Sequence, residues 1–209
     1  MVIRVLMADD HPIVRKGLEM ILSEQLDFAV HGVGTFPELR AELMHQAPDV
    51  LLLDVNMPGG SGLEMIGEAK KLYPNLPVLV LSIYSEDQFG VRAILAGASG
   101  YLTKESAPDQ MVNAIKALKN GKRFISHELA EALADYVQRP DGKKERHDTL
   151  SERELSVLKM IASGMSTGDI AKSLNLSPKT VSTYRSRILE KMRLHSNADL
   201  TRYVIDNKL

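Results

Sequence analysis

Residues 50–58 read Val-Leu-Leu-Leu-Asp-Val-Asn-Met-Pro, a short apolar run that ends in an acid, Asp54. The start of the chain repeats this pattern, because residues 3–10 read Ile-Arg-Val-Leu-Met-Ala-Asp-Asp and end in Asp9 and Asp10. Continuous apolar runs of this length are typical of strands buried on both faces, as in parallel sheets. Open α/β folds bind ligands at the carboxyl ends of their strands, so we expect the three carboxylates to converge at one sheet edge.

Three carboxylates at one edge repel one another and raise one another's pKa values unless a cation lies among them. Mg²⁺ is a small, hard cation that prefers such oxygen ligands. The pattern therefore predicts a Mg²⁺ site that contains a reactive aspartate.

The composition allows two small soluble domains. The chain has 209 residues, of which 44% are hydrophobic and 25% are charged. It has no cysteine, which excludes disulfide frameworks, thiolate zinc sites and thiol catalysis. The apolar opening, residues 1–7, is too short to cross a membrane and lacks a signal-peptide cleavage pattern. We therefore expect a cytoplasmic protein without a membrane partner.

The net charge of −1 points to no partner, but the distribution of charge does. Residues 179–193 carry five basic residues against one acid, Glu190, whereas acids gather near the start of the chain. This asymmetry indicates an acidic-site domain joined to a basic domain that faces a polyanion. A solvated helix face is the alternative interpretation of the basic segment.

The first half of the chain alternates strand and helix patterns. Apolar runs at 3–7, 29–33, 50–53, 78–81 and 100–102 are separated by helical patterns at 12–23, 36–46, 63–73, 87–96 and 108–120. This alternation predicts an α/β fold: a doubly wound, five-stranded parallel sheet in a domain that spans residues 1–121. Turn residues at Pro58-Gly59-Gly60 and Asn120-Gly121 support the breaks between elements.

The rest of the chain is predicted to be helical. Residues 122–148 read as a linker with one helix at 128–137, because residues 138–148 are polar and broken by Pro140 and Gly142. Residues 149–209 form a second, smaller all-α domain that begins with a capping box at Ser151 and Glu154. Two short helices joined at residues 174–176, the second one basic, make a helix-turn-helix.

Along nearly its whole length the chain resembles the NarL/FixJ-type two-component response regulators, which join a phosphoacceptor receiver domain to a LuxR-type helix-turn-helix. The receiver resemblance lies in Asp9-Asp10-His11-Pro12, Asp54-Val-Asn-Met-Pro58 with Gly62, Leu81-Ser82 and Gly100-Tyr-Leu-Thr-Lys104. The second resemblance lies in Leu150-Ser-Glu-Arg-Glu-Leu155, Gly164-Met-Ser-Thr167, Asp169-Ile-Ala171 and Ser177-Pro-Lys-Thr-Val181. Each motif alone is weak, but together and in this order they are highly specific.

The resemblance implies a phosphorylation site. Asp54 would accept a phosphoryl group from a partner histidine kinase or a small phosphodonor. Asp9 and Asp10 would hold Mg²⁺ together with Asp54 and the backbone carbonyl of Asn56. The alternatives are that Asp54 caps a turn and that the acid pair caps the following helix. We expect His11 to pack or hydrogen-bond locally and leave it out of the site.

The resemblance also implies a switch around that site. Lys104 would pair with a phosphoryl oxygen, and Ser82 would donate its hydroxyl to the phosphoryl group and move with it. Tyr101 would change rotamer in response. A buried hydroxyl and a packing tyrosine are the plain alternatives for the last two residues.

The basic helix has a core side and an outer side at about 100° per residue. Val181, Ile188 and Met192 fall on the core side, and the family's DNA-contacting positions fall on the outer one. We expect contacts to the groove from Ser182, Thr183 and Ser186, and contacts to phosphates from Lys179, Thr180, Arg185 and Arg187. Arg185 lies nearer the core side and must reach outward along its stem.

The chain departs from the family pattern at three places. Many relatives have lysines where this chain has Ser182 and Ser186, so its groove contacts should be less electrostatic. Residues 167–169 read Thr-Gly-Asp where the family usually shows Asn-Lys-Glu, and Gly168 removes a possible phosphate contact. Glu105 follows Lys104 where many receivers have proline, and the sequence leaves open whether that peptide bond is cis.

The expected function is that of a cytoplasmic transcription regulator. Phosphorylation at Asp54 would favour a homodimer that binds paired half-sites of double-stranded promoter DNA. Two rivals remain. A Mg²⁺-dependent phosphatase would place nucleophile and acid two residues apart on one strand, whereas these carboxylates lie on different strands. A receiver that acts as a binding module without phosphate would not need the full set of Asp9, Asp10, Asp54, Ser82 and Lys104.

Overall fold

The computed structural model describes residues 2–57, 60–83, 86–106, 108–138, 146–207 and 209. The chain forms two compact units, Met1–Pro140 and Asp141–Leu209. The expected turn at Pro58-Gly59 and most of the expected linker, residues 139–145, lie outside the described residues. Within the described ranges, every helix is too short or too polar to span a bilayer.

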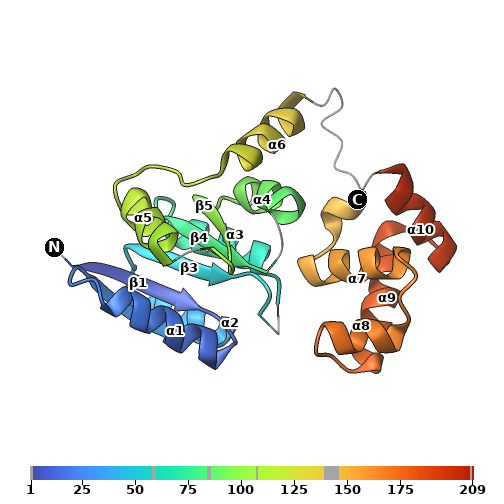
Figure 1. Cartoon of the computed structure of the whole chain (residues 1–209), viewed down its shortest axis with the longest axis horizontal. Helices are drawn as coiled ribbons and strands as arrows, with labels where there is room; N and C mark the ends of the chain where they lie inside the picture. Colours follow the sequence, from blue (N-terminus) through green and yellow to red (C-terminus); the bar gives the residue numbers. More distant parts are fainter. Residues whose placement is uncertain (1, 58–59, 84–85, 107, 139–145, 208) are drawn as a thin grey trace. The chain divides into compact units, whose positions relative to one another are not determined.

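The first unit is built on five parallel strands in the order β2-β1-β3-β4-β5. Figure 1 labels four of them, β1, β3, β4 and β5. The strands are β1 (Ile3–Ala8), β2 (Phe28–Val33), β3 (Val50–Asp54), β4 (Val78–Ser82) and β5 (Gly100–Thr103). Every residue of β3 and β4 is buried, as expected for central strands covered on both faces. The predicted α/β fold with a doubly wound five-stranded sheet is therefore confirmed.

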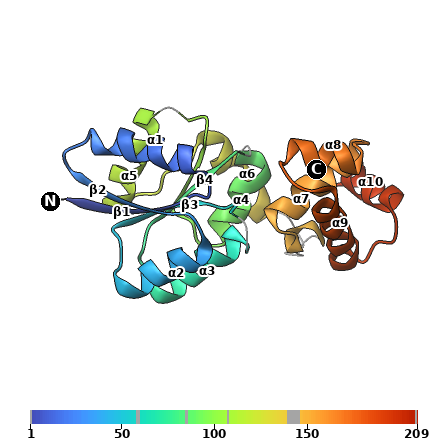
Figure 2. The same ribbon diagram turned by 90° about the horizontal axis from the view of Figure 1, so that it is seen from below.

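Helices cover both faces of this sheet. They are α1 (Pro12–Ser23), α2 (Phe36–His45), α3 (Gly62–Leu72), α4 (Glu86–Leu95) and α5 (Pro108–Lys119). Figure 2 shows α1 and α5 on one face and α2 and α3 on the other. The core under α1 and α5 joins Val5, Leu52 and Leu79 of the strands to Leu22 and Ile115 of the helices. Burial of these apolar side chains holds the strand ends in register.

The register brings the ends of the strands to one edge. Ala8 pairs with Leu53, Asp54 pairs with Leu81, and Ser82 pairs with Thr103. The residues that follow these pairs, including Lys104, therefore leave the sheet at the same edge. The Lys104–Glu105 peptide is trans, because the described residues contain no cis bond.

A sixth helix, α6 (His127–Gln138), belongs to the first unit and packs against α4. The contact is close, because a Cβ atom on Gly90 of α4 would lie 2.7 Å from Leu129 Cδ1. Ser126 accepts a hydrogen bond from the Leu129 amide and donates its hydroxyl to Glu86, the first residue of α4. The expected linker helix thus has a partner in the first unit, while the expected bounds 1–121, 122–148 and 149–209 remain predictions.

The described residues of the second unit form a short 3-10 turn, η1 (Arg146–Thr149), and four helices. These are α7 (Glu152–Ala162), α8 (Thr167–Ser173), α9 (Pro178–Met192) and α10 (Asn197–Asp206). Ser151 caps α7 in the predicted capping box, and Ser177 caps α9. Asn175 has a φ of 52° in the turn between α8 and α9, a left-handed conformation that Asn tolerates.

Candidate phosphoacceptor site and nucleic-acid interface

The acidic cluster lies at the carboxyl edge of the sheet, as predicted. Asp9 and Asp54 are almost completely buried, whereas Asp10 is partly exposed. Ligand atoms of Asp9, Asp10, His11 and Asp54 all lie within 4.8 Å of one another. Oxygen donors at this spacing suit a hard divalent cation.

Lys104 is the ammonium that pairs with the clustered carboxylates. Its Nζ lies 2.6 Å from Asp54 Oδ2 and 2.7 Å from Asp9 Oδ2, and its side chain is only 13% exposed. Its backbone amide also donates to the Ser82 carbonyl at 2.7 Å, which joins the ends of β4 and β5. One ammonium thus serves two buried carboxylates, with the third carboxylate of Asp10 close by.

This arrangement leaves the edge short of positive charge. Burial raises the pKa of Asp54 above its ordinary value, and the neighbouring Asp9 carboxylate adds to the rise. Lys104 and the Asn56 amide, which donates to Asp54 Oδ1 at 2.8 Å, oppose the rise without cancelling it. Burial lowers the pKa of Lys104, but its pairing with Asp54 and Asp9 outweighs burial, so that this pKa is raised. A divalent cation would supply the missing charge, and the residues present therefore fit one.

Of the expected switch residues, Ser82 lies next to the cluster and Tyr101 lies in the interior of the unit. Ser82 ends β4 fully buried, and the Asn56 side-chain amide lies 3.4 Å from its hydroxyl. Tyr101 is also fully buried, on β5, where it pairs with Val80. The structure therefore brings Asn56 and Ser82 to Asp54 and places Tyr101 in the interior of the unit. The roles assigned to these residues remain predictions.

His11 is a residue that the sequence reasoning left out of the site. Its backbone amide donates to Asp9 Oδ1 at 2.8 Å, which is the local hydrogen bond that was expected. Its Nδ1, however, lies 2.8 Å from Asp10 Oδ1, so the imidazole borders the cluster. Its position directly after two acids was the available signal.

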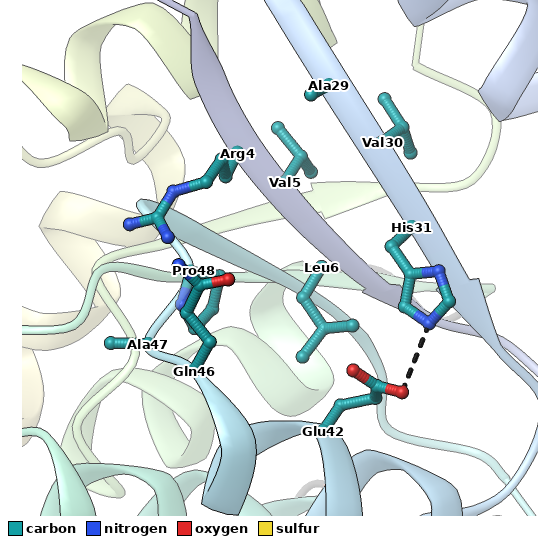
Figure 3. A pocket seen from close by; sticks show the side chains of 10 residues that line it. All are labelled: Arg4, Val5, Leu6, Ala29, Val30, His31, Glu42, Gln46, Ala47 and Pro48. Atoms are coloured by element: carbon teal, nitrogen blue, oxygen red, sulfur yellow. Dashed lines mark ion pairs between the residues drawn. The ribbon is translucent and has the colours of Figure 1, made fainter.

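A separate groove of about 300 Å³ lies between β1, β2 and α2 (Figure 3). His31 and Glu42 form an ion pair of 3.4 Å across its end, as Figure 3 shows. Leu6 and Val30 also line it. None of the three clustered aspartates lines the groove, so it is no part of the phosphoacceptor site.

Helix α9 of the second unit carries the predicted DNA-contacting residues. Val181, Ile188 and Met192 are buried, and the predicted outer residues are exposed except for Thr180 and Arg185, which are half-buried. The hydroxyls on this face bond back to their own helix: Ser182 donates to Pro178, Thr183 to Lys179 and Ser186 to Ser182, at 3.0–3.1 Å.

Two basic side chains of α9 have partners inside the second unit. Arg185 Nε donates to Asn197 Oδ1 at 2.6 Å, at the start of α10. Lys191 Nζ lies 2.7 Å from Oε2 of the buried Glu154, the acid of the α7 capping box. Among the described residues, Lys179 and Arg187 form no ion pair. The net positive charge displayed by α9 is therefore smaller than the sequence suggests.

Comparisons with known proteins cover both units. Residues 5–116 match the model of the response regulator receiver domain, and residues 148–204 match that of the bacterial regulatory proteins of the luxR family. The response regulator UvrY of Escherichia coli K12 is 35% identical over 208 residues, which cover 99% of this chain and 95% of UvrY. The response regulator GacA of Pseudomonas aeruginosa is 39% identical over 199 residues, which cover 95% of this chain and 93% of GacA.

Solved structures agree with this assignment. A structure of RcsB from Salmonella enterica serovar Typhimurium, bound to the promoter rprA in the presence of the phosphomimetic BeF3⁻, is 27% identical. The alignment covers 97% of this chain and 98% of the RcsB chain, with a TM-score of 0.60. The paired match of receiver and helix-turn-helix places this chain in the NarL/FixJ family of two-component response regulators.

Proposed function

We propose that the protein is a phosphorylation-switched transcription regulator in which Asp54 accepts a phosphoryl group from a histidine kinase. The observation that carries the proposal is the buried Asp54 carboxylate, held 2.6 Å from Lys104 and beside two further acids. Catalysis of phosphoryl transfer consists mainly of positioning and charge neutralisation. Both requirements fit a site whose side chains lie at the ends of four strands, β1, β3, β4 and β5.

The transfer balances as a direct displacement. An Asp54 carboxylate oxygen attacks phosphorus, the phosphorus–nitrogen bond to the kinase histidine breaks, and the electron pair leaves with the imidazole, which takes up a proton. Asp9, Asp10, Asp54 and the backbone carbonyl of Asn56 would hold Mg²⁺, which when bound neutralises charge on the phosphoryl oxygens. Lys104 turns from Asp54 to a phosphoryl oxygen and supplies further neutralisation.

The phosphoryl group changes the charge around Ser82. It carries a charge of about −1.5 to −2 and adds strong hydrogen-bond acceptors. The Ser82 hydroxyl moves from its place beside Asn56 to donate to the new group, and Tyr101 repacks in response. Because Glu86 at the start of α4 accepts from Ser126 at the start of α6, movement of this region is passed to α6.

The output is sequence-specific binding of double-stranded promoter DNA by α9. Lys179, Thr180, Arg185 and Arg187 are proposed to contact phosphates, and Ser182, Thr183 and Ser186 to enter the groove. Phosphorylation favours a homodimer whose two α9 helices read paired half-sites. The similar protein RcsB has been solved in a complex with DNA, which supports this use of the second unit. A DNA-binding regulator of this family acts in the cytoplasm.

The test compares the wild-type chain with Asp54→Asn. Each protein is incubated with acetyl phosphate and Mg²⁺, and phosphorylation and promoter footprints are measured together. The wild type should gain one phosphoryl group and bind DNA more tightly, whereas Asp54→Asn should do neither. Asp49→Asn is the matched control, since Asp49 pairs with Lys119 and Arg4 before β3 and should leave both readouts unchanged.

Three results would contradict the proposal. The first is phosphorylation of Asp54→Asn at the same level with the same gain in binding. The second is turnover of a generic phosphate ester far faster than Asp54 loses its own phosphate, which would favour the phosphatase. The third is equal DNA binding with and without phosphate, which would favour a phosphate-independent binding module.

A further inference from the structure

Arg15 reaches the acidic edge by a route that the sequence motifs do not show. It lies in the second turn of α1, and its Nη1 donates a hydrogen bond to the backbone carbonyl of Asp9 at 2.5 Å. The Asp9 amide donates in turn to the Val33 carbonyl at 3.1 Å. Both polar backbone groups of Asp9 are therefore fixed, one by β2 and the other by the guanidinium.

Two glycines leave room for this side chain. A Cβ atom on Gly32 would lie 2.8 Å from Glu19 Oε1 and 3.2 Å from both Cγ and Cδ of Arg15, and a Cβ atom on Gly34 would lie 3.3 Å from Nη1. Neither glycine has a left-handed φ, so the backbone does not require glycine at these positions. Their shared role is steric, because residues two apart on an extended chain face the same side.

The held carbonyl lies between the two acids of the cluster. It belongs to the peptide that links Asp9 to Asp10, so fixing it fixes the direction in which both carboxylates leave the chain. The Asp9 side chain accepts from Lys104 on one oxygen and from the His11 amide on the other. A rotation of this peptide would therefore move Asp9 and Asp10 relative to Asp54.

We infer that Arg15 is a positioning residue of the phosphoacceptor site, which orients the Asp9–Asp10 pair for a divalent cation. Its side chain reaches the Asp9 carbonyl through the space that Gly32 and Gly34 leave free. The inference rests on the proposed function, in which that cation assists phosphorylation of Asp54. Arg15 does not touch the reacting atoms, so its effect acts through the affinity for the cation.

The test uses full-length Arg15→Gln and Arg15→Lys, with Arg40→Gln as the matched control. Arg40 is an arginine of the same unit that makes two hydrogen bonds to Glu68, at 2.6 and 2.9 Å, away from the site. Three quantities are measured: the Mg²⁺ dissociation constant by titration calorimetry, the initial rate of phosphorylation by acetyl phosphate across Mg²⁺ concentrations, and the thermal midpoint.

Arg15→Gln should weaken Mg²⁺ binding about 10-fold, the lower end of the effect of losing a group that orients a metal ligand. Its phosphorylation rate should approach that of the wild type at saturating Mg²⁺, and Arg15→Lys should recover part of the affinity. Arg40→Gln should leave Mg²⁺ affinity unchanged. A lower thermal midpoint with unchanged Mg²⁺ affinity in Arg15→Gln would overturn the inference and leave Arg15 a structural residue only.

Gly34→Val gives an independent test that keeps the arginine. The larger side chain should displace Nη1 and weaken Mg²⁺ binding, and the double variant with Arg15→Gln should bind Mg²⁺ no worse than Arg15→Gln alone. Additive losses would overturn the inference. If the wild type bound no Mg²⁺ and accepted no phosphoryl group, the proposed function would fail. If the wild type did both and Arg15→Gln kept the Mg²⁺ affinity of the wild type, only the inference about Arg15 would fail.

Discussion

The acidic edge of the first unit and the outer face of α9 in the second are built in opposite ways. The acidic edge brings the buried carboxylates of Asp9 and Asp54 together with the partly buried Lys104, residues that lie up to 95 positions apart in the chain. The face of α9 takes exposed side chains from one stretch of 15 residues. The acidic edge depends on the fold of the whole unit and holds several charged groups within bonding distance of one another. The face of α9 depends only on helical geometry, and most of its charged groups are exposed to solvent along the helix.

The largest effect is expected where charge is most concentrated. Lys104→Met should lower the free energy of unfolding of the first unit by about 3 kcal/mol, because it leaves buried carboxylates without their cation. Added Mg²⁺ should restore part of the loss by binding the folded state. Urea unfolding with and without MgCl₂ measures both effects.

The control is Lys119→Met, which removes the partly buried pair of Lys119 with Asp49, 2.8 Å apart, in which the ammonium is more exposed than that of Lys104 and which should cost about 1 kcal/mol or less. Equal losses in the two variants, or no recovery with Mg²⁺, would show that the acidic edge is no more strained than an ordinary surface pair.

A smaller effect is expected at Glu154, a buried carboxylate of the second unit that takes part in both a helix cap and an ion pair. Glu154→Gln should cost about 2 kcal/mol, because it breaks the charge-assisted pair with Lys191 at a buried position, although the remaining side-chain oxygen can still accept from the Ser151 amide. Hydrogen exchange should show faster opening of α7 to α10 and unchanged protection of β1 to β5. Glu190→Gln, on the exposed face of α9, is the control and should change neither.

The pH dependence of Glu154 follows from its pKa. Burial raises this pKa, but Lys191 and the Ser151 amide outweigh burial and hold it below its ordinary value. The ionised folded form is thus favoured, and its stabilisation is present above the ordinary pKa of Glu and is lost as the pH falls through the lowered one. The loss in free energy of unfolding caused by Glu154→Gln should therefore become smaller as the pH falls. A loss that did not depend on pH would contradict this prediction.

Asp54 should show the opposite sign. Burial holds its pKa above the ordinary value, so the folded chain binds a proton more tightly than the unfolded chain. Without divalent cations, the wild type should gain stability relative to Asp54→Asn as the pH falls through the raised pKa toward the ordinary one. The effect should be smaller than the loss in Glu154→Gln, because Lys104 and the Asn56 amide offset part of the burial. Thermal midpoints of the wild type and Asp54→Asn across acidic pH measure this gain. If the midpoints of the two proteins changed with pH in parallel, Asp54 and Glu154 would not differ in sign as predicted.

The smallest change in stability is expected on α9. Ser182→Lys and Ser186→Lys should alter the free energy of unfolding by no more than about 0.5 kcal/mol, because both residues are exposed. Each new phosphate contact should steepen the slope of log affinity for DNA against log salt by about 0.9. Thr201→Lys on α10 is the control, since Thr201 also bonds back to its helix, donating to the Asn197 carbonyl at 3.0 Å. An equal change of slope in Thr201→Lys would mean that α9 has no special place in DNA binding.

The sequence predicted what depends on periodicity. Apolar runs that end in acids gave the sheet edge with Asp9 and Asp54, and helical geometry gave the buried side of α9 at Val181 and Ile188. The first result follows from continuous apolar runs and the second from a repeat of 3.6 residues, and a linear sequence carries both patterns.

The sequence could not predict contacts between side chains from different elements. The apolar spacing of residues 128–137 predicted a helix but not that this helix, α6, packs against α4, where Leu129 lies over Gly90. The basic count of α9 did not show that Lys191 is paired with Glu154. These contacts depend on tertiary distances that no local pattern encodes.

The strand order has a consequence for how the chain is completed at the ribosome. β1 and β3 are neighbours, so Asp9 and Asp54 can meet as soon as the first three strands have emerged. Their ammonium partner follows 50 residues after Asp54, which at ordinary elongation rates is roughly 3 to 10 seconds later. During that interval the nascent sheet holds Asp9 and Asp54 together without the ammonium that pairs with both carboxylates. Only dissolved cations and charges made earlier, such as the Arg15 guanidinium at the Asp9 carbonyl, can shield them. The phosphoacceptor site is therefore complete only when β5 has been made and pairs with β4.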